Sequence, residues 1–222
     1  MKIIEPSFEI MYMPSPTNIL LVLERAARVC YKSEDKTKPE SANTIIHGLI
    51  KSGHESVIEH MGVTVKFTCD RGISHELVRH RIASFSQEST RYANYSKEKF
   101  GNEITVIRPI FWPAGHMLYT LWRQSCKVAE TSYLTLLKRG ATAQEARSVL
   151  PNSLKTEVVT TANLREWRHI LRLRCSKASH PQIRQIMLPL LDELNSQLPV
   201  LFEQLYEKYH ADILKLTNTG LL

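Results

Sequence analysis

One segment in the first third of the chain alternates apolar and polar side chains without interruption, and it constrains the fold most. From Val63 to Cys69 every odd position is apolar, while Thr64, Lys66 and Thr68 are polar. A period of two residues is typical of a β-strand with one buried face. Further strands are predicted over residues 1–4, 8–13, 104–108 and 154–161.

The other periodic segments are helical, and they outnumber the strands. We expect Gly53 to end one helix in a left-handed conformation and Ser74 to start another. Thr142 and Glu145 have the spacing of a capping box, which begins a short helix that Pro151 ends. The helix started by Ser74 is a short one over 75–80. The longer predicted helices cover residues 17–31, 41–52, 117–138, 163–176 and 182–209, the last with a kink near Pro189 and a bend near Pro199.

These elements predict an α+β fold with a mostly antiparallel mixed sheet covered by helices and a prominent helical part. The chain has 222 residues, of which 43% are hydrophobic, so we expect a single domain spanning 1–222. No apolar run approaches the roughly 20 residues of a membrane span. Glu5 and Pro6 interrupt the apolar start where a signal peptide would continue. We therefore expect a cytoplasmic protein that does not enter a membrane.

The cysteines are spread along the chain, at Cys30, Cys69, Cys126 and Cys175, and none belongs to a Cys-x-x-Cys pair. This spacing predicts neither a disulfide nor a zinc site, and we expect all four to be small core residues. Residues 54–60 also lack the His-Glu-x-x-His spacing of a helical zinc site. No metal site is predicted, and we expect His60 to be a structural histidine.

The fourteen residues 79–92 contain three arginines, a histidine and three serines. Each guanidinium is a fork of donors suited to phosphate or carboxylate, and three so close together repel one another unless anions or water neutralise them. Composition alone leaves two alternatives. The segment is either a solvated basic loop or a site for a polyanionic ligand that carries phosphates.

The predicted helix 163–176 has an arginine on its apolar side. Leu164, Trp167 and Leu171 form an apolar stripe, and Arg174 projects within about 20° of Trp167 on a helical wheel. An unpaired arginine is costly to bury, so Arg174 either pairs with a core carboxylate, extends to the surface, or points into a ligand pocket. A different face carries Arg165, Arg168, His169 and Arg172.

Common nucleotide-binding motifs are missing from the sequence. It contains neither Gly-x-Gly-x-x-Gly after a strand nor Gly-x-x-x-x-Gly-Lys-[Ser/Thr], so side chains would have to hold any phosphates. Ser89 lacks a recognisable general base, which favours a phosphate-binding hydroxyl over a nucleophile. The net charge of +7 and the scattered aromatics would also suit a binder of single-stranded nucleic acid. The clustering of arginines in 79–91 and 165–184 favours discrete sites instead.

The order of residues in 79–92 resembles the signature of the flavin-dependent thymidylate synthases. It reads Arg79-His80-Arg81, seven further residues, Ser89 and then, two residues on, Arg91-Tyr92. Similar segments are 53–56, Ala-Arg-x-x-Leu-Pro over 146–151, and 163–174, and the likeness runs from 26–31 to 180–184. It favours the anion site for 79–92 and a pocket for Arg174.

The resemblance implies a mixed sheet with helices, assembled as a homotetramer with sites at the subunit interfaces. It implies FAD as cofactor, dUMP as substrate, 5,10-methylenetetrahydrofolate as the one-carbon donor and NADPH as reductant, with dTMP as product. Neither nucleic acid nor membrane is an expected partner.

The resemblance also implies roles for individual residues. Flavin contacts would come from Ser56, Arg79, His80, Arg81, Gln87, Asn163, Arg165 and His169. Nucleotide contacts would come from Glu76, Arg79, Gln87, Ser89, Thr90 through its backbone, Arg91, Arg147 and Arg174. Of these, Arg174 would face the uracil ring as the catalytic residue, and Gln87 would lie where flavin and nucleotide meet.

Three positions differ from the usual family pattern. Gln87 stands where some members have Glu, and His169 stands where some have Asn. Each exchange keeps a hydrogen-bonding side chain but changes its charge or its tautomer options. Ser86 replaces a common Asn, and we treat that exchange as neutral.

Overall fold

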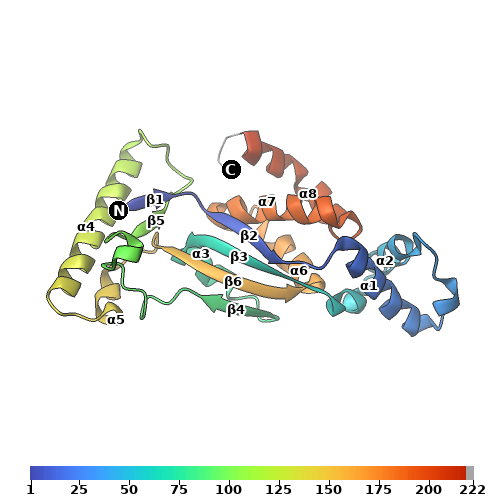
Figure 1. Ribbon diagram of the computed structural model, residues 1–222. Coiled ribbons are helices and arrows are strands. Elements are labelled where there is room, and N and C mark those ends of the chain that lie inside the picture. Colours follow the sequence, from blue (N-terminus) through green and yellow to red (C-terminus); the bar gives the residue numbers. More distant parts are fainter. Residues whose placement is uncertain (219–222) are drawn as a thin grey trace. The chain divides into compact units, whose positions relative to one another are not determined.

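The computed structural model describes residues 1–218, whose course is shown in Figure 1. A four-stranded sheet has the order β2–β3–β6–β4, and β1 and β5 form a separate pair. The strands are β1 (Lys2–Ile4), β2 (Ser7–Tyr12), β3 (Gly62–Asp70), β4 (Ala83–Gln87), β5 (Thr105–Ile107) and β6 (Lys155–Asn163). The α-helices are α1 (Pro16–Tyr31), α2 (Ser41–Lys51), α3 (Arg71–Leu77), α4 (Met117–Lys138), α5 (Ala143–Ala146), α6 (Leu164–Arg174), α7 (Pro181–Gln197) and α8 (Pro199–Asn218).

The chain divides into two compact units. Unit 1 comprises residues 1–7, 66–79 and 85–159, and unit 2 comprises 8–65, 80–84 and the described residues from 160 onward. Short 3-10 helices add η1 (Glu34–Lys36), η2 (Glu55–His60), η3 (Glu98–Phe100) and η4 (Arg147–Val149). The single domain expected over 1–222 stays a prediction. No helix within residues 1–218 combines the length and the hydropathy that crossing a membrane requires.

The strand expected at 63–69 is β3, and its odd-numbered side chains from Val63 to Cys69 are buried. Its neighbour β6 runs antiparallel to it. Thr64 Oγ1 lies 2.9 Å from Thr161 Oγ1, whereas the Arg71 N–H, just beyond the other end of β3, donates to the Leu154 carbonyl at 3.1 Å. With the parallel β1–β5 pair and the helices, this confirms the α+β fold with antiparallel pairing.

Unit 1 packs a long helix against a short parallel strand pair. In Figure 1, α4 runs beside β1 and β5, and their shared core includes Ile104, Val106 and Tyr133. The predicted bounds of α4 are confirmed. The capping box of Thr142 and Glu145 is also confirmed, because the Glu145 carboxylate accepts the Thr142 N–H at 2.7 Å.

The helix expected over 75–80 is displaced, and its predicted start at Ser74 is wrong. α3 begins after Asp70, whose carboxylate accepts the Ile73 N–H at 2.7 Å and so caps the first turn. Ser74 lies inside the helix and donates its hydroxyl to the Arg71 carbonyl at 2.9 Å. Because α3 ends at Leu77, His80 lies in the following loop rather than on a helix.

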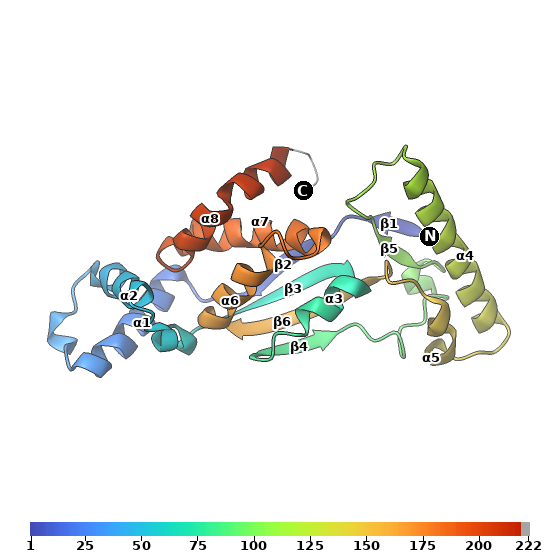
Figure 2. The same cartoon turned by 180° about the vertical axis from the view of Figure 1, so that it is seen from behind.

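Unit 2 is largely helical. Figure 2 shows α7 and α8 side by side, with α6 against them. Gly53 has φ of 74°, which confirms the left-handed end after α2. The helix expected over 182–209 is two helices, because the chain leaves helical geometry at Leu198 and α8 starts at Pro199. Pro189 lies inside α7.

The predicted apolar stripe of α6 is confirmed. Leu164, Trp167 and Leu171 are fully buried, and the Trp167 indole N–H donates to the Val63 carbonyl at 3.0 Å. This bond fixes the rotation of α6 against β3.

The expectation that all four cysteines lie in the core is wrong for one of them. Cys69, Cys126 and Cys175 are buried, but Cys30 is exposed. It lies in the last turn of α1, where Val29 and Tyr31 are exposed as well. His60, expected to be structural, is exposed at the end of η2.

Candidate active site

The residues expected at the site are divided between the two units. Unit 1 contains Glu76, Arg79, Gln87, Ser89, Thr90, Arg91 and Arg147. Unit 2 contains Ser56, His80, Arg81, Asn163, Arg165, His169 and Arg174. Most of the basic members have exposed side chains, which suits contact with a soluble anion.

Gln87 ends β4, a strand that the sequence analysis does not predict. Its amide nitrogen donates to Ser74 Oγ at 2.8 Å and to Thr156 Oγ1 at 3.3 Å. Because Ser74 has already given its only proton to the Arg71 carbonyl, it can only accept here. An amide is therefore better suited than a carboxylate to this position.

The segment after β4 is a tight turn that carries a hydroxyl group beside a guanidinium. Ser89 Oγ accepts the Arg91 N–H at 3.3 Å, and the Ser89 carbonyl accepts the Ala93 N–H at 2.9 Å. Arg147 approaches the same turn and donates to Thr90 Oγ1 at 3.4 Å. Ser89, Arg91 and Arg147 are exposed, so this part of unit 1 presents donors that suit a phosphate.

Glu88 anchors that turn, and the sequence analysis does not identify it. Its carboxylate accepts from the Lys155 ammonium and from the Tyr95 hydroxyl, each at 3.0 Å. Burial, together with the Glu88 charge, raises the pKa of Tyr95, so the phenol keeps its proton. Lys155 lies 67 residues from Glu88, and no local pattern in the sequence predicts such a pair.

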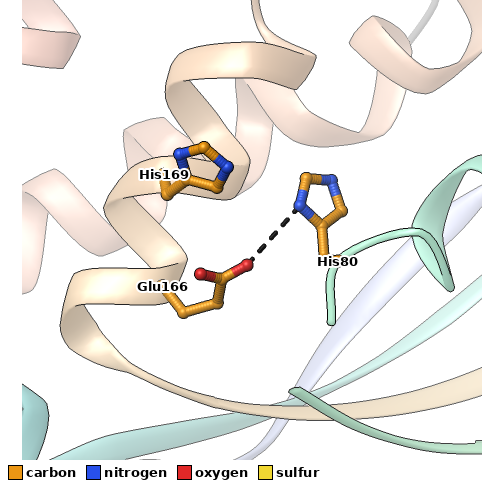
Figure 3. Close-up of side chains that lie close together, drawn as sticks. All are labelled: His80, Glu166 and His169. Atoms are coloured by element: carbon orange, nitrogen blue, oxygen red, sulfur yellow. Dashed lines mark ion pairs between the residues drawn. The ribbon is translucent and has the colours of Figure 1, made fainter. Parts of the chain in front are cut away.

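The group in unit 2 centres on His80, which is 5% exposed. Figure 3 shows its ring facing Glu166, with His169 on the same helix as Glu166. His80 Nδ1 lies 3.6 Å from Glu166 Oε1, and His80 Nε2 accepts the Nε–H of Arg174 at 3.0 Å. The ring of His169 stands nearly perpendicular to that of His80, at 5.9 Å between centroids.

The contacts of His80 define its protonation. Burial, reinforced by the charges of Arg174 and His169, lowers the pKa of His80 to about 4. The ring is therefore neutral at pH 7, and its contact with Glu166 is not an ion pair. Since Arg174 can only donate, Nε2 carries no proton and Nδ1–H faces the carboxylate. Burial raises the pKa of Glu166, and the charge of His169 opposes this shift.

These side chains also offer a donor set for a metal ion. One nitrogen from each histidine and one oxygen of Glu166 lie within 4.8 Å of one another. A metal would need a lone pair on His80, however. Nε2 uses its lone pair to accept from Arg174, and Nδ1 carries the proton. The observed contacts therefore suit a neutral imidazole held between a guanidinium and a carboxylate better than a metal centre.

Glu55 organises the basic face of α6. Its carboxylate accepts from Arg168 at 3.2 Å and lies 3.9 Å from Arg165 and 4.0 Å from Arg172. Arg168 differs from its basic neighbours in burial, because this side chain is 2% exposed and also donates to the Leu201 carbonyl. Burial lowers the pKa of Arg168, and Glu55 opposes that shift.

A hollow in unit 2 brings several of the expected flavin contacts together. It measures about 420 Å³, which lies within the range of ligand sites. Asn163 uses its side-chain oxygen to cap α6, accepting the Glu166 N–H at 2.8 Å, so its amide NH₂ is the group it can donate to a ligand. The lining comprises Glu55, Glu59, Ile82, Asn163, Arg165, Glu166, His169 and Arg172.

Side chains in and beside this hollow fit an anionic, aromatic dinucleotide such as FAD. Arg165 and Arg172 supply cations, each also near a carboxylate of the hollow (Glu59 at 2.6 Å and Glu55 at 4.0 Å), and the exposed Ile82 supplies apolar surface. The neighbouring hollow of about 480 Å³ adds Arg81. The N-terminus of α6, capped by Asn163, also favours negative charge.

Comparison with known proteins identifies the family. The family model described as "Thymidylate synthase complementing protein" matches residues 10–200. The flavin-dependent thymidylate synthase of Corynebacterium aurimucosum is 32% identical over 209 residues, covering 86% of this chain and 82% of that protein. The enzymes of the same name from Mycolicibacterium vanbaalenii and Pyrococcus abyssi are 34% and 32% identical, covering 82% and 73% of this chain and 77% and 66% of their own.

A solved structure shares the fold. The UMP/dUMP methylase of Streptomyces cacaoi, crystallised with 5-Br dUMP, superposes with a TM-score of 0.75 at 24% identity, over 94% of this chain and 98% of that one. The Arg-His-Arg motif, the matched family model and the coverage of the chain by these relatives all indicate the same family. The chain belongs to the flavin-dependent thymidylate synthase family.

Proposed function

We propose that this member of the flavin-dependent thymidylate synthases methylates dUMP to dTMP with 5,10-methylenetetrahydrofolate as carbon donor and NADPH as reductant of FAD. The observation that carries the proposal is the contact between Arg174 and the neutral ring of His80. It holds a half-buried guanidinium at the end of α6, on the helix that also lines the hollow described above.

Arg174 is the catalytic residue in this proposal. Carbon C5 of uracil is a weak nucleophile until electron density is pushed into the ring. A guanidinium against the ring carbonyl and N3 favours an anionic form of the base, and it does so more strongly where water is scarce. Because His80 is uncharged, it orients Arg174 without neutralising the guanidinium.

Nucleotide binding is assigned to unit 1. The exposed hydroxyl of Ser89, the backbone of Thr90 and the guanidinium groups of Arg91 and Arg147 would bind the phosphate. Glu76 and Arg79 would contribute further contacts, and Gln87 would lie between nucleotide and flavin.

Flavin binding is assigned to Ser56, Arg79, His80, Arg81, Asn163, Arg165 and His169, with Gln87. When bound, the flavin supplies hydride chemistry, which no amino-acid side chain provides. The protein's part is to bind and orient the reactants and to exclude water. The proposal also includes a homotetramer with sites at the subunit interfaces and a cytoplasmic location.

The direct test is formation of dTMP by the purified protein. The complete mixture of FAD, NADPH, dUMP and 5,10-methylenetetrahydrofolate is expected to give dTMP on chromatography, and omission of any one component should abolish it. A protein that binds FAD but yields no dTMP from the complete mixture contradicts the proposal. Light scattering on the same preparation tests the tetramer.

Nucleic-acid binding is the alternative function that the same preparation can examine. It predicts a colourless protein whose affinity for single strands falls steeply with salt. A yellow protein that NADPH bleaches under anaerobic conditions is the result expected here.

A further inference from the structure

Glu166 is a buried carboxylate to which the proposed function gives no role. It is 8% exposed, lies in the first turn of α6 and directs Oε1 at the imidazole of His80, 3.6 Å from Nδ1 (Figure 3). The other ring nitrogen of His80 accepts the Nε–H of Arg174 at 3.0 Å. The imidazole thus stands between a carboxylate and a guanidinium.

We propose that Glu166 is a positioning residue for Arg174 and that it acts by fixing the tautomer of His80. The partners of the two ring nitrogens decide which of them carries the proton. Arg174 requires Nε2 to be an acceptor, and Glu166 favours the proton on Nδ1. This inference rests on the proposed role of Arg174 in the reaction.

The separation of 3.6 Å is longer than a direct hydrogen bond, so Glu166 acts through the attraction of its electronegative side-chain oxygen for the Nδ1–H dipole. This attraction is strong because both groups are buried and little water screens them. Burial of His80 also keeps its ring neutral, so that the tautomer rather than the charge of the ring is the property that Glu166 sets.

Loss of Glu166 changes the contact between the Arg174 guanidinium and the ring of His80. Some His80 rings would take the tautomer with the proton on Nε2, which opposes the Nε–H of Arg174 with a second donor. The guanidinium would then turn away. Its Nη groups, which carry its other four N–H donors, would move with it. A misplacement of about 1 Å at a reacting group can cost as much as 10²-fold in rate.

The tautomer is measured directly by ¹⁵N NMR of the histidine rings at about pH 8. Comparison with the spectrum of His80→Gln assigns the His80 signals. The unaltered protein should show a protonated Nδ1 and an unprotonated Nε2, and Glu166→Ala should show a mixture of both tautomers. A protonated Nε2 in the unaltered protein overturns the proposal, and so does a tautomer that Glu166→Ala leaves unchanged.

Kinetics supply the second measurement. Glu166→Ala should lower kcat about tenfold while the affinity for FAD and the KM for dUMP change less than about twofold, because positioning acts in the transition state. Glu166→Gln should keep kcat within about threefold, since its amide oxygen can still face Nδ1–H. Equal losses in both variants would assign the effect to charge alone and refute the tautomer explanation.

Glu203→Ala is the matched control, because Glu203 is an exposed carboxylate on α8 of the same unit. It should change neither the tautomer nor kcat. If Glu166→Ala does not fold, the spectra of the unaltered protein and of Glu166→Gln still decide the outcome. If the unaltered protein makes no dTMP, the proposed function fails, whereas the tautomer measurement still tests the chain of contacts.

Discussion

Gln87→Glu is expected to destabilise the protein, although the family resemblance implies glutamate at this position in some members. The amide nitrogen of Gln87 donates to Ser74 and Thr156, and the exchange removes both donors. Each hydrogen bond contributes about 1 kcal/mol, so their loss costs roughly 2 kcal/mol. Ser74 could turn its proton toward the new carboxylate, but it would then abandon the Arg71 carbonyl, so this adjustment recovers little.

For a chain of this length, ~1 kcal/mol shifts the melting temperature by about 2–4 °C, so the expected loss is about 4–8 °C. The assay is thermal unfolding followed by circular dichroism at pH 7 without ligands. Gln87→Met, which removes the donors without introducing a charge, should fall between the unaltered protein and Gln87→Glu. Gln124→Glu is the control, because Gln124 is exposed on α4 in the same unit.

The reasoning is refuted if Gln87→Glu melts within about 1 °C of the unaltered protein, a change below ~0.5 kcal/mol. It is also refuted if Gln87→Met is the less stable of the two variants. Either result would mean that Ser74 and Thr156 do not require a donor from residue 87.

Three further predictions concern the site. Arg174→Ala and Arg174→Lys should each lower kcat by about 10²-fold with FAD binding retained. Lysine is no substitute, because a point charge cannot replace the planar guanidinium. Normal turnover in either variant contradicts the catalytic role of Arg174. Arg147→Ala should raise the KM for dUMP by about tenfold or more, the cost of one hydrogen bond to a charged group, with kcat little changed in steady-state assays. The pKa of His80, lowered to about 4 by burial and the neighbouring charges, means that the unfolded chain binds more protons between about pH 6.5 and 4. The free energy of unfolding should therefore fall by up to roughly 3 kcal/mol as the pH drops through this range. Urea unfolding at several pH values should show a weaker dependence of this free energy on pH for His80→Gln than for the unaltered protein.

Local patterns predict most of the helices and strands correctly. The bounds of α4 and the capping box at Thr142 depend on residues close in sequence. The start of α3 is predicted wrongly because Asp70 and Ser74 are both good capping residues four positions apart, and the cap is Asp70, the last residue of β3. β4 is missed because its alternation, in Ala-Ser-Phe-Ser-Gln, is weak.

The candidate site is less accessible to sequence reasoning than the fold. The motif and the helical wheel single out His80 and Arg174 separately, but their contact joins residues 94 positions apart. Glu166 is overlooked because an acidic residue in the first turn of a helix is common without any ligand. Glu166 lies three residues before His169, so both are on one face of the helix. This spacing is the sequence feature that could have identified Glu166 as part of the site.

The burial of Trp167 has a consequence for how this site can change. α6 extends about 16 Å at 1.5 Å per residue, and Glu166, His169 and Arg174 are fixed to it as to one rigid rod. A substitution that lets Trp167 rotate away from the Val63 carbonyl would swing all of these groups together. Variants remote from any ligand, in the hydrophobic interior beneath α6, should therefore alter turnover as readily as exchanges of the reacting residues themselves.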